Sequence, residues 1–335
     1  MKLVRVLLFP LMPLYFFGAW ARNKLFDFGI LKSKSYNLPI ICIGNLSTGG
    51  TGKTPMVEYL IRLIKDKSNV AVLSRGYKRK TKGFVMADFS STVEDIGDEP
   101  YQYYSKFANI KVAVDESRVH GIDSLLELKD PPHSIILDDA FQHRYVDAGL
   151  NILLTSFDKP FYEDVILPTG NLREPRMGYK RAHIIIVTKS PDNLEEVDKI
   201  KIVNKIKPLG HQRVFFSSIK YGGVALNLKK KSIALDSFGS FTLVTGIANP
   251  QPFVDYLKSI GHTFKEIRYP DHHDFSERNL ADLQKKGRIL TTEKDFVRLS
   301  GTSLVETNEV YYIPIEFTID RPKEFEELIE KFRTR

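Results

Sequence analysis

The sequence predicts an α/β protein in which helices flank a mostly parallel sheet, with a second, smaller α/β domain after it. Three observations support this fold class. After residue 36, short apolar segments alternate with segments whose apolar residues recur at helical spacing. Several short segments are continuous, such as IIIV at 184–187, as expected for strands that helices cover on both faces. The 335 residues correspond to about two domains of roughly 150 residues each.

The most apolar part of the chain lies near its N-terminus. Residues 7–20 (LLFPLMPLYFFGAW) carry no charge over fourteen positions, whereas a membrane-spanning helix needs about 20 apolar residues. Pro10 and Pro13 would interrupt a regular helix, and no A-x-A cleavage site follows. We expect residues 1–35 to form a membrane-associated helical segment in the lipid headgroup region, with basic residues on its flanks. The alternative is a helix that packs on the protein's own core.

The charge of the chain points to the same segment. The formal net charge is +8, and residues 1–40 contribute +5 of it, through six basic residues and one acidic residue. A basic excess indicates nucleic acid, an anionic membrane or phosphorylated substrates as partners. Because this excess lies beside apolar residues and not along a groove-sized basic face, we expect anionic phospholipids and no nucleic acid. The single cysteine, Cys42, excludes an internal disulfide and fits a reducing compartment.

Residues 36–220 have the pattern of one α/β domain. Between the first two predicted strands, the apolar residues of segment 56–64 recur at helical spacing, and Pro55 stands in the first helical turn, where its missing N–H costs nothing. This strand–loop–helix–strand unit indicates a parallel sheet, whose ligand sites lie at the carboxyl ends of its strands. The predicted strands are 39–44, 70–74, 110–114, 134–137, 151–155 and 183–188.

Residues 221–335 are predicted to form the second domain. YGG at 221–223 and KKK at 229–231 indicate a linker, with a small hairpin over residues 214–228. A second α/β unit follows, and it ends in a helix whose apolar residues stand at i, i+3, i+4 and i+7. Its predicted elements are strands at 241–245, 288–291 and 310–315, a helix that opens at 249–250, and the final helix at 325–332.

The strongest chemical signal lies between the first predicted strand and the first predicted helix. A phosphate-binding loop needs glycines that let the backbone wrap an anion, a Lys for the β- and γ-phosphates, and a Ser or Thr hydroxyl for Mg²⁺. Gly52, Lys53 and Thr54 supply those parts, and Ser47 stands where the strict pattern has glycine. We therefore predict a P-loop-type domain that binds ATP and Mg²⁺, rather than a glycine-rich turn that binds nothing. The predicted nucleotide-binding residues are Ser47, Thr48, Gly49, Gly50, Thr51, Gly52, Lys53 and Thr54.

A pair of acidic residues follows another predicted strand. The segment 134–139 reads SIILDD, so Asp138 and Asp139 emerge at the carboxyl end of that strand. Nucleotide-binding domains of this type hold the metal ion at that place. A helix cap or a turn is the alternative role, because Asp is favoured there as well. With the phosphate loop present, the sequence predicts Mg²⁺ coordination by Thr54, Asp138 and Asp139.

Phosphoryl transfer to an alcohol also needs a group that accepts or orients the hydroxyl proton. Candidates are Asp98, Asp115 and the cluster DHHD at 271–274, and the residue pattern does not choose among them. Adjacent histidines point in different directions on a regular element, so we do not expect both histidines of this cluster to hold one metal ion.

Two basic loops offer guanidinium groups that suit phosphate. One is SRGYKRK at 74–80, where Arg75 follows the second predicted strand and so lies near the phosphate loop. The other is NLREPR at 171–176. The alternative for both loops is a solvated basic face.

Together, these motifs resemble those of the bacterial tetraacyldisaccharide 4′-kinases, the lipid A 4′-kinase family. The resemblance runs through most of the chain, and the set is specific although no single motif is. Ala140 stands where the family commonly has glycine. The motifs are GNLSTGGTGKTP at 44–55, SRGY at 74–77, GDEP at 97–100, DDAFQHR at 138–144, LREP at 172–175, TGIANPQPF at 245–253 and DHHDF at 271–275.

The resemblance implies an activity and its setting. The activity would be ATP- and Mg²⁺-dependent transfer of the γ-phosphate to the 4′-hydroxyl of a tetraacylated glucosamine disaccharide 1-phosphate, which gives lipid IVA in lipopolysaccharide biosynthesis. The lipid substrate would lie at the membrane surface, and the enzyme would be peripheral or monotopic at the cytoplasmic face of the bacterial inner membrane. A lipid substrate also accounts for the aromatic, basic N-terminus. The sequence indicates no obligate protein partner.

The resemblance also implies roles for individual residues. Asp98 would be the catalytic base, paired with a histidine of the second domain, where His272 matches the family position better than His273. Lys53 and Arg75 would stabilise phosphate charge. The site would then lie between the domains and close when both substrates bind. Residues that contact substrate or orient the catalytic groups would be Glu99, Arg118, Gln142, His143, Arg173 and Glu174.

Two other functions are compatible with some of these sequence features. One is a soluble kinase or ligase that acts on a non-lipid substrate, and the other is a membrane-recruited regulatory ATPase that phosphorylates no acceptor. A soluble kinase needs no aromatic, basic N-terminus, and a regulatory ATPase needs neither an acceptor base nor a separate substrate domain. The apolar segment 7–20 and the cluster at 271–274 therefore favour the lipid kinase.

Overall fold

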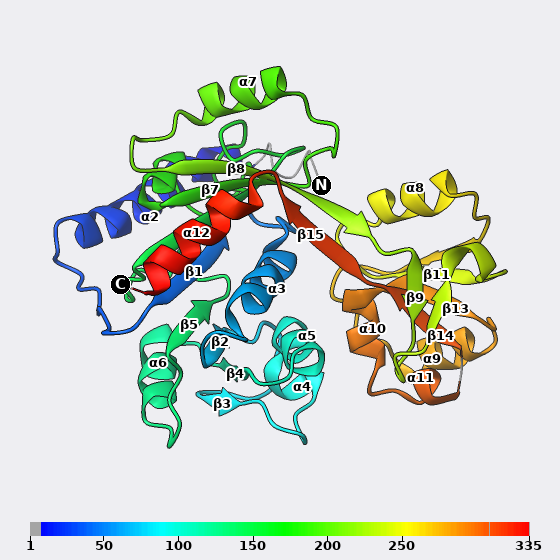
Figure 1. Cartoon of the computed structure of the whole chain (residues 1–335). Coiled ribbons are helices and arrows are strands. Elements are labelled where there is room, and N and C mark those ends of the chain that lie inside the picture. The colour runs from blue at the N-terminus through cyan, green and yellow to red at the C-terminus, as the bar shows by residue number, and fades with distance from the viewer. Residues whose placement is uncertain (1–7, 308, 335) are drawn as a thin grey trace.

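Two sheets form the framework of the protein, seen here in a computed structural model that describes residues 8–307 and 309–334 (Figure 1). The strands of the first sheet are β1 (Ile40–Asn45), β2 (Val70–Ser74), β3 (Val85–Met86), β4 (Lys111–Val114), β5 (Ser134–Leu137), β6 (Leu150–Ser156), β7 (Ile184–Thr188), β8 (Arg213–Tyr221) and β15 (Ile315–Ile319). Within the described residues they lie in the order β15-β8-β7-β6-β1-β5-β2-β4-β3. All pair in parallel except the edge strands β3 and β15. The predicted mostly parallel α/β fold is confirmed.

Helices cover both faces of the first sheet. They are α2 (Met12–Asp27), α3 (Lys53–Ile64), α4 (Val93–Ile96), α5 (Asp98–Lys106), α6 (Arg118–Leu126), α7 (Glu196–Ile206) and α12 (Pro322–Arg333), with the 3-10 turn η2 (Arg176–Arg181). In β1, Ile41 and Ile43 face the core shared with α3, α5 and α12, whereas Ile40 and Cys42 face the core shared with α6 and α7. Alternate residues of one strand are thus buried on opposite faces, which is why the strands read as continuous apolar runs.

The second sheet is smaller and is also covered on both faces. Its elements are β9 (Val224–Leu226), β10 (Ser232–Ala234), η3 (Leu235–Ser237), β11 (Thr242–Thr245), α8 (Gln251–Ser259), β12 (Lys265–Arg268), α9 (Glu277–Gln284), β13 (Ile289–Thr292), α10 (Glu293–Leu299), α11 (Ser303–Thr307) and β14 (Val310–Ile313). The strand order is β10-β9-β14-β13-β11-β12. Phe253 and Leu257 of α8 pack on one face, and Leu283 of α9 and Leu299 of α10 pack on the other.

The predicted hairpin over residues 214–228 is wrong. β8 pairs with β7 and β15 in the first sheet, while β9 pairs with β10 and β14 in the second. Because both edges of β8 are taken by other strands, β9 cannot fold back onto it. The chain instead crosses between the two sheets at Gly222 and Gly223, where the predicted linker lies.

The strand pairing also differs from the predicted division of the chain at 221–335. After Pro314 the chain returns to the first sheet, where β15 pairs antiparallel with β8 (Figure 1). α12 then buries Phe325 and Ile329 in the core of the first sheet. An amphipathic helix fits either sheet, and the long-range pairing of β15 decides which one. We use "second domain" below for residues 224–313, which are inserted between two strands of the first domain.

The N-terminal segment forms the 3-10 turn η1 (Phe9–Leu11) followed by α2. Pro10 lies in η1 and Pro13 lies in the first turn of α2, where a missing N–H breaks no helical bond. The prolines therefore shape the start of the helix and do not interrupt it. Residues 1–7 of the predicted segment 1–35 lie outside the described residues. Within the described part of the chain, no helix is long and apolar enough to cross a membrane.

One side of α2 packs on the first domain and another side is exposed. Ala19 packs against the core, and Phe26 is buried between the guanidinium groups of Arg22 and Arg144, 5.4 and 5.0 Å from its ring centroid. The packed side agrees with the alternative prediction for this segment, a helix that packs on the protein's own core. The exposed side of α2 and the adjoining η1 are the basis for the membrane prediction. Their large exposed apolar side chains are Phe9 and Leu11 in η1 and Leu14, Phe16 and Phe17 in α2.

Candidate active site

The eight residues predicted to bind the nucleotide form one loop between β1 and α3. Gly52 has a φ of +81°, a conformation that favours glycine, and it directly precedes α3. Three contacts fix the loop. Thr48 N donates to Asn171 O (2.7 Å), Thr188 Oγ1 donates to Thr51 O (2.8 Å), and Lys189 Nζ donates to Gly50 O (2.6 Å). The loop therefore presents its backbone N–H groups and a helix N-terminus at the carboxyl edge of the sheet, which suits a phosphate group.

Asp139 lies between two cations beside this loop. Its carboxylate is 3.6 Å from Lys53 Nζ and accepts from Arg173 Nη1 at 3.1 Å on both oxygens. Burial tends to raise the pKa of Asp139, but the charges of Lys53 and Arg173 outweigh it and lower the pKa. Asp139 is therefore an ionised carboxylate in contact with the lysine of the phosphate loop.

Asp138 is buried, and one of its oxygens is unpaired. Oδ2 accepts from Ser74 Oγ (3.2 Å) and from Tyr103 OH (3.4 Å), whereas Oδ1 has no hydrogen-bond partner among the described residues. The Tyr103 hydroxyl also bonds the Thr54 side chain, which places Thr54 next to Asp138. Burial and the charge of Asp139 raise the pKa of Asp138. An alcohol, two carboxylates and an unpaired buried oxygen fit the oxygen ligands of Mg²⁺.

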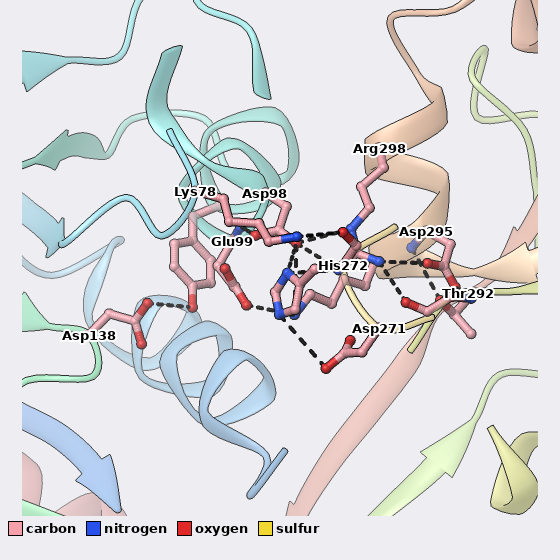
Figure 2. Close-up of polar contacts among 12 residues, drawn as sticks. Lys78, Asp98, Glu99, Asp138, Asp271, His272, Thr292, Asp295 and Arg298 are labelled. Carbon is pink, nitrogen blue, oxygen red and sulfur yellow. Dashed lines mark hydrogen bonds and ion pairs between the residues drawn. The ribbon is translucent and has the colours of Figure 1, made fainter. Parts of the chain in front are cut away.

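Asp98 and His272 meet across the boundary between the domains. Asp98 begins α5, while His272 lies in the loop after β12, and His272 Nδ1 is 2.9 Å from Asp98 Oδ2. Figure 2 shows this pair at the domain boundary, with Asp138 on the side of the first domain. His273 points elsewhere, because it stacks on Tyr269 at 4.5 Å and bonds Asn279 at 3.0 Å. The sequence alone did not exclude His273, and the geometry pairs Asp98 with His272.

Two cations of α10 complete this cluster, and the sequence motifs did not point to them. Arg298 donates to Asp98 Oδ2 from Nε (3.0 Å) and Nη2 (2.7 Å), and Lys294 Nζ lies 2.6 Å from Glu99 Oε1 and 3.3 Å from His272 Nε2. Their i, i+4 spacing puts both side chains on one face of a helix. This spacing is the only feature of the sequence that could have linked the two residues to each other. Nothing local to α10 shows that this face meets α5, so sequence reasoning missed them.

These contacts set the protonation of the two adjacent carboxyl groups. Burial tends to raise the pKa of Asp98, but His272, Lys294 and Arg298 outweigh it and hold the pKa well below its usual range. Burial and the neighbouring Asp98 raise the pKa of Glu99 to about 7. Asp98, Glu99 and His272 offer ligand atoms within 4.8 Å of one another. Because the two cations already contact those atoms, the residues that could hold a metal ion are Asp138 and Asp139 rather than this cluster.

The other predicted residues support the site in different ways. Arg118 is buried and donates to Asp115 O (2.8 Å) and Asp138 O (2.9 Å), so it holds the end of β5. Arg75 is exposed at the end of β2. His143 is partly exposed, and its Nε2 lies 3.2 Å from Glu116 O.

Gln142 and Glu174 connect the site to the N-terminal helix. Gln142 Nε2 donates to Glu174 Oε1 (2.9 Å), and the backbone oxygen of Gln142 accepts from Arg22 (3.0 Å). Glu174 also accepts from Asn23 at 2.8 Å, and Tyr15 OH donates to Arg173 O at 3.0 Å. The helix with the exposed apolar side therefore contacts the same loop that supplies Arg173 to Asp139.

Comparison with known proteins gives the family. A family model described as "Tetraacyldisaccharide-1-P 4′-kinase" matches residues 4–333. The tetraacyldisaccharide 4′-kinase of Flavobacterium johnsoniae is 49% identical, over 95% of this chain and 94% of that protein, and that of Bacteroides fragilis is 47% identical, over 93% and 88%. A crystal structure of LpxK from Aquifex aeolicus in complex with ATP is 32% identical with a TM-score of 0.79, and the match covers 98% of this chain and 99% of that one. The chain belongs to the tetraacyldisaccharide 4′-kinase family.

Proposed function

We propose that the protein transfers the γ-phosphate of ATP to the 4′-hydroxyl of a tetraacylated glucosamine disaccharide 1-phosphate, giving lipid IVA in lipopolysaccharide biosynthesis. One observation carries the proposal. A phosphate-binding loop with Lys53 and an acid–base pair of Asp98 and His272 lie at the same edge of the first sheet, with the histidine supplied by the second domain. Family membership over nearly the whole chain agrees with it.

Phosphoryl transfer depends mainly on positioning and on neutralising charge. The backbone N–H groups of residues 49–54 and the Lys53 ammonium group would hold the β- and γ-phosphates, and Arg75 extends the positive charge at the end of β2. Thr54, Asp138 and Asp139 would hold Mg²⁺, which supplies further positive charge to the phosphates when bound. Arg173 keeps Asp139 ionised and in place.

The acceptor hydroxyl must lose its proton as the new bond forms. We assign this step to the pair of Asp98 and His272: the proton passes to His272 Nε2, while the ionised Asp98 accepts a hydrogen bond from Nδ1. Asp98 then acts through the histidine, whereas the resemblance implied Asp98 itself as the base. Arg298 fixes the Asp98 carboxylate, and Asp295 and the Gly246 oxygen fix Arg298 in turn, each at 2.8 Å. The pair forms only when the two domains are together, which ties proton removal to a closed site.

The direct test of the function is a transfer assay. The purified full-length chain is incubated with γ-labelled ATP, Mg²⁺ and the tetraacyldisaccharide 1-phosphate in phospholipid vesicles. Label is expected at the 4′ position of the lipid, and a Lys53→Met variant should transfer little of it. Label released only as free phosphate would instead indicate a regulatory ATPase, and label on a water-soluble acceptor would indicate a soluble kinase.

We further propose that η1 and the exposed side of α2 dock the enzyme peripherally on anionic phospholipids at the cytoplasmic face of the inner membrane. The exposed side chains of Phe9, Leu14 and Phe17 support this, being 55%, 73% and 63% exposed. Lys24, in the last turn of the same helix, adds a basic group that suits anionic headgroups. This would bring the lipid sugar to a site that faces water.

Triple substitution of Phe9, Leu14 and Phe17 by serine is expected to weaken vesicle binding by at least about tenfold, because each large apolar side chain contributes roughly 1.5–3 kcal/mol when buried. Co-sedimentation with phosphatidylglycerol–phosphatidylethanolamine vesicles measures the loss. The matched control replaces Val197 and Ile200, which are exposed apolar residues of α7, by serine. Equal binding by the triple variant and the wild type would contradict the docking surface.

A further inference from the structure

Lys294 contacts the outer side of the acid–base pair. α10 carries it from the second domain, and its Nζ lies 2.6 Å from Glu99 Oε1, 3.3 Å from His272 Nε2 and 3.8 Å from Asp98 Oδ2. Its side chain is 25% exposed. The phosphoryl transfer described above assigns no part to it. An ammonium group fixed against the free nitrogen of a catalytic histidine must nevertheless affect where that histidine carries its proton.

We propose that Lys294 is a positioning residue for phosphoryl transfer: held by Glu99, its ammonium group keeps His272 Nε2 unprotonated and so fixes the tautomer that can accept the hydroxyl proton. The inference rests on the proposed function. A neutral imidazole donates from one nitrogen and accepts at the other. Ionised Asp98 can only accept a hydrogen bond, and the Lys294 ammonium group can only donate one. Both bonds to His272 form when Nδ1 carries the proton and Nε2 carries the lone pair.

Glu99 makes this arrangement usable in catalysis. The contact of Lys294 with Glu99 is 2.6 Å, whereas its contact with His272 is 3.3 Å, so Glu99 is the stronger anchor. When an acceptor hydroxyl approaches Nε2, the ammonium group can stay on Glu99 and leave Nε2 to the hydroxyl.

The other charged groups around His272 do not replace Lys294. Arg298 Nη2 is also a donor and lies 3.2 Å from Nδ1, but it donates to Asp98 Oδ2 at 2.7 Å, and that oxygen is closer to Nδ1, at 2.9 Å, so Nδ1 keeps an acceptor for its proton. Lys78 donates to the backbone oxygen of His272 at 2.9 Å. Asp271 Oδ2 is 3.9 Å from Nε2, which is beyond hydrogen-bond distance. The titratable and charged groups facing His272 are Asp98 and Glu99 from α5, Lys294 and Arg298 from α10, Asp271 from its own loop, and Tyr77 and Lys78 from the loop after β2.

The first experiment reads the imidazole directly and does not need substrate. In full-length protein labelled with ¹⁵N-histidine, the His272 signals are assigned by comparison with a His272→Gln variant. We expect a protonated Nδ1 and an unprotonated Nε2 in the wild type at neutral pH. In Lys294→Met, the midpoint of His272 protonation should rise by about one pH unit, because a single nearby charge shifts a pKa by about 1–3 units. Lys294→Arg keeps the charge and should stay close to the wild type.

The second experiment is the pH dependence of kcat/KM in the lipid transfer assay. The pH at which kcat/KM falls off on the acid side should be higher in Lys294→Met by the same amount. In Lys294→Arg this pH should be close to that of the wild type. Lys285→Met is the matched control, since Lys285 is a surface residue that follows α9 and pairs with Asp282. If Lys294→Met does not fold, Lys294→Gln takes its place, because its amide can still bond Glu99.

A role of Lys294 as a tether between domains predicts a different result. The variant would then lose thermal stability and kcat, while the protonation midpoint of His272 and the acid limb stayed in place, and that outcome would overturn the proposal. A wild-type protein that transfers no label to lipid would refute the proposed function alone. The NMR titration would still decide whether Lys294 sets the protonation of His272.

Discussion

Asp98→Asn is expected to lower kcat by about 10²- to 10⁴-fold, the usual contribution of general acid–base catalysis, while the affinity for ATP stays within about twofold. The asparagine keeps the size of the side chain and an acceptor oxygen, but it has no negative charge and so forms no ion pair with His272 or Arg298. Asp98 lies outside the phosphate loop, which is why ATP binding is spared. Steady-state kinetics of lipid phosphorylation and titration with ATP measure the two effects separately.

Asp66→Asn is the matched control for this variant, because Asp66 is an exposed acidic residue that follows α3. Thermal unfolding of both variants separates a catalytic effect from loss of structure, since loss of the Asp98 carboxylate leaves the Arg298 guanidinium group with fewer partners. A folded Asp98→Asn protein whose kcat stayed close to that of the control would remove Asp98 from the proton-transfer step.

Lys106→Met is expected to lower the free energy of unfolding by about 3–5 kcal/mol, the usual cost of removing one partner from a buried ion pair. Lys106 Nζ lies 2.7 Å from Glu58 and 2.6 Å from Glu293, whose side chains are 2% and 7% exposed. Glu58 would keep contacts with Arg62 and Gln102. Glu293 has a second oxygen with no partner among the described residues, so the charge left unpaired would be mainly its own.

The pH dependence of this loss has a defined sign. Burial and the charge of Glu58 already raise the pKa of Glu293, so in the folded state it binds a proton more readily than in the unfolded state. The penalty for its charge is therefore absent at low pH and grows as pH rises through the raised pKa. Urea unfolding at about pH 5 and pH 8 should show the larger loss in Lys106→Met at the higher pH.

Lys201→Met serves as the control for Lys106→Met, because Lys201 pairs with Asp198 on the surface of α7. Exposed pairs of this kind contribute roughly 0–1 kcal/mol. Equal losses in the two variants would mean that the Lys106 cluster does not stabilise the contact between α3, α5 and α10.

The phosphate loop could be predicted from the sequence because its chemistry is local. Gly52, Lys53 and Thr54 are consecutive, and the strand before them and the helix after them have clear patterns of their own. Asp138 and Asp139 were found for the same reason, since parallel strands end at one edge of a sheet. The predicted roles of these residues await the experiments above.

The parts that sequence analysis missed all depend on contacts between distant segments. The predicted strand 310–315 stops where β15 begins, and only the pairing of β15 with β8 assigns residues 315–319 to the first sheet. Lys294 and Arg298 look like ordinary surface cations of a short helix until α10 meets α5. Lys189 likewise shows no motif, although its ammonium group fixes Gly50 in the phosphate loop.

The insertion of the second domain between β8 and β15 also sets the order in which the chain can fold during synthesis. β8 leaves the ribosome long before β15, and the whole second domain is made between them. Until residues 315–319 emerge, one edge of β8 has no partner strand, and unpaired strand edges promote association with other chains. A second domain that folds early would hold the ends of residues 222–314 close together and deliver β15 to the waiting edge. Rapid folding of the inserted domain would thus shorten the time for which this edge of β8 is exposed.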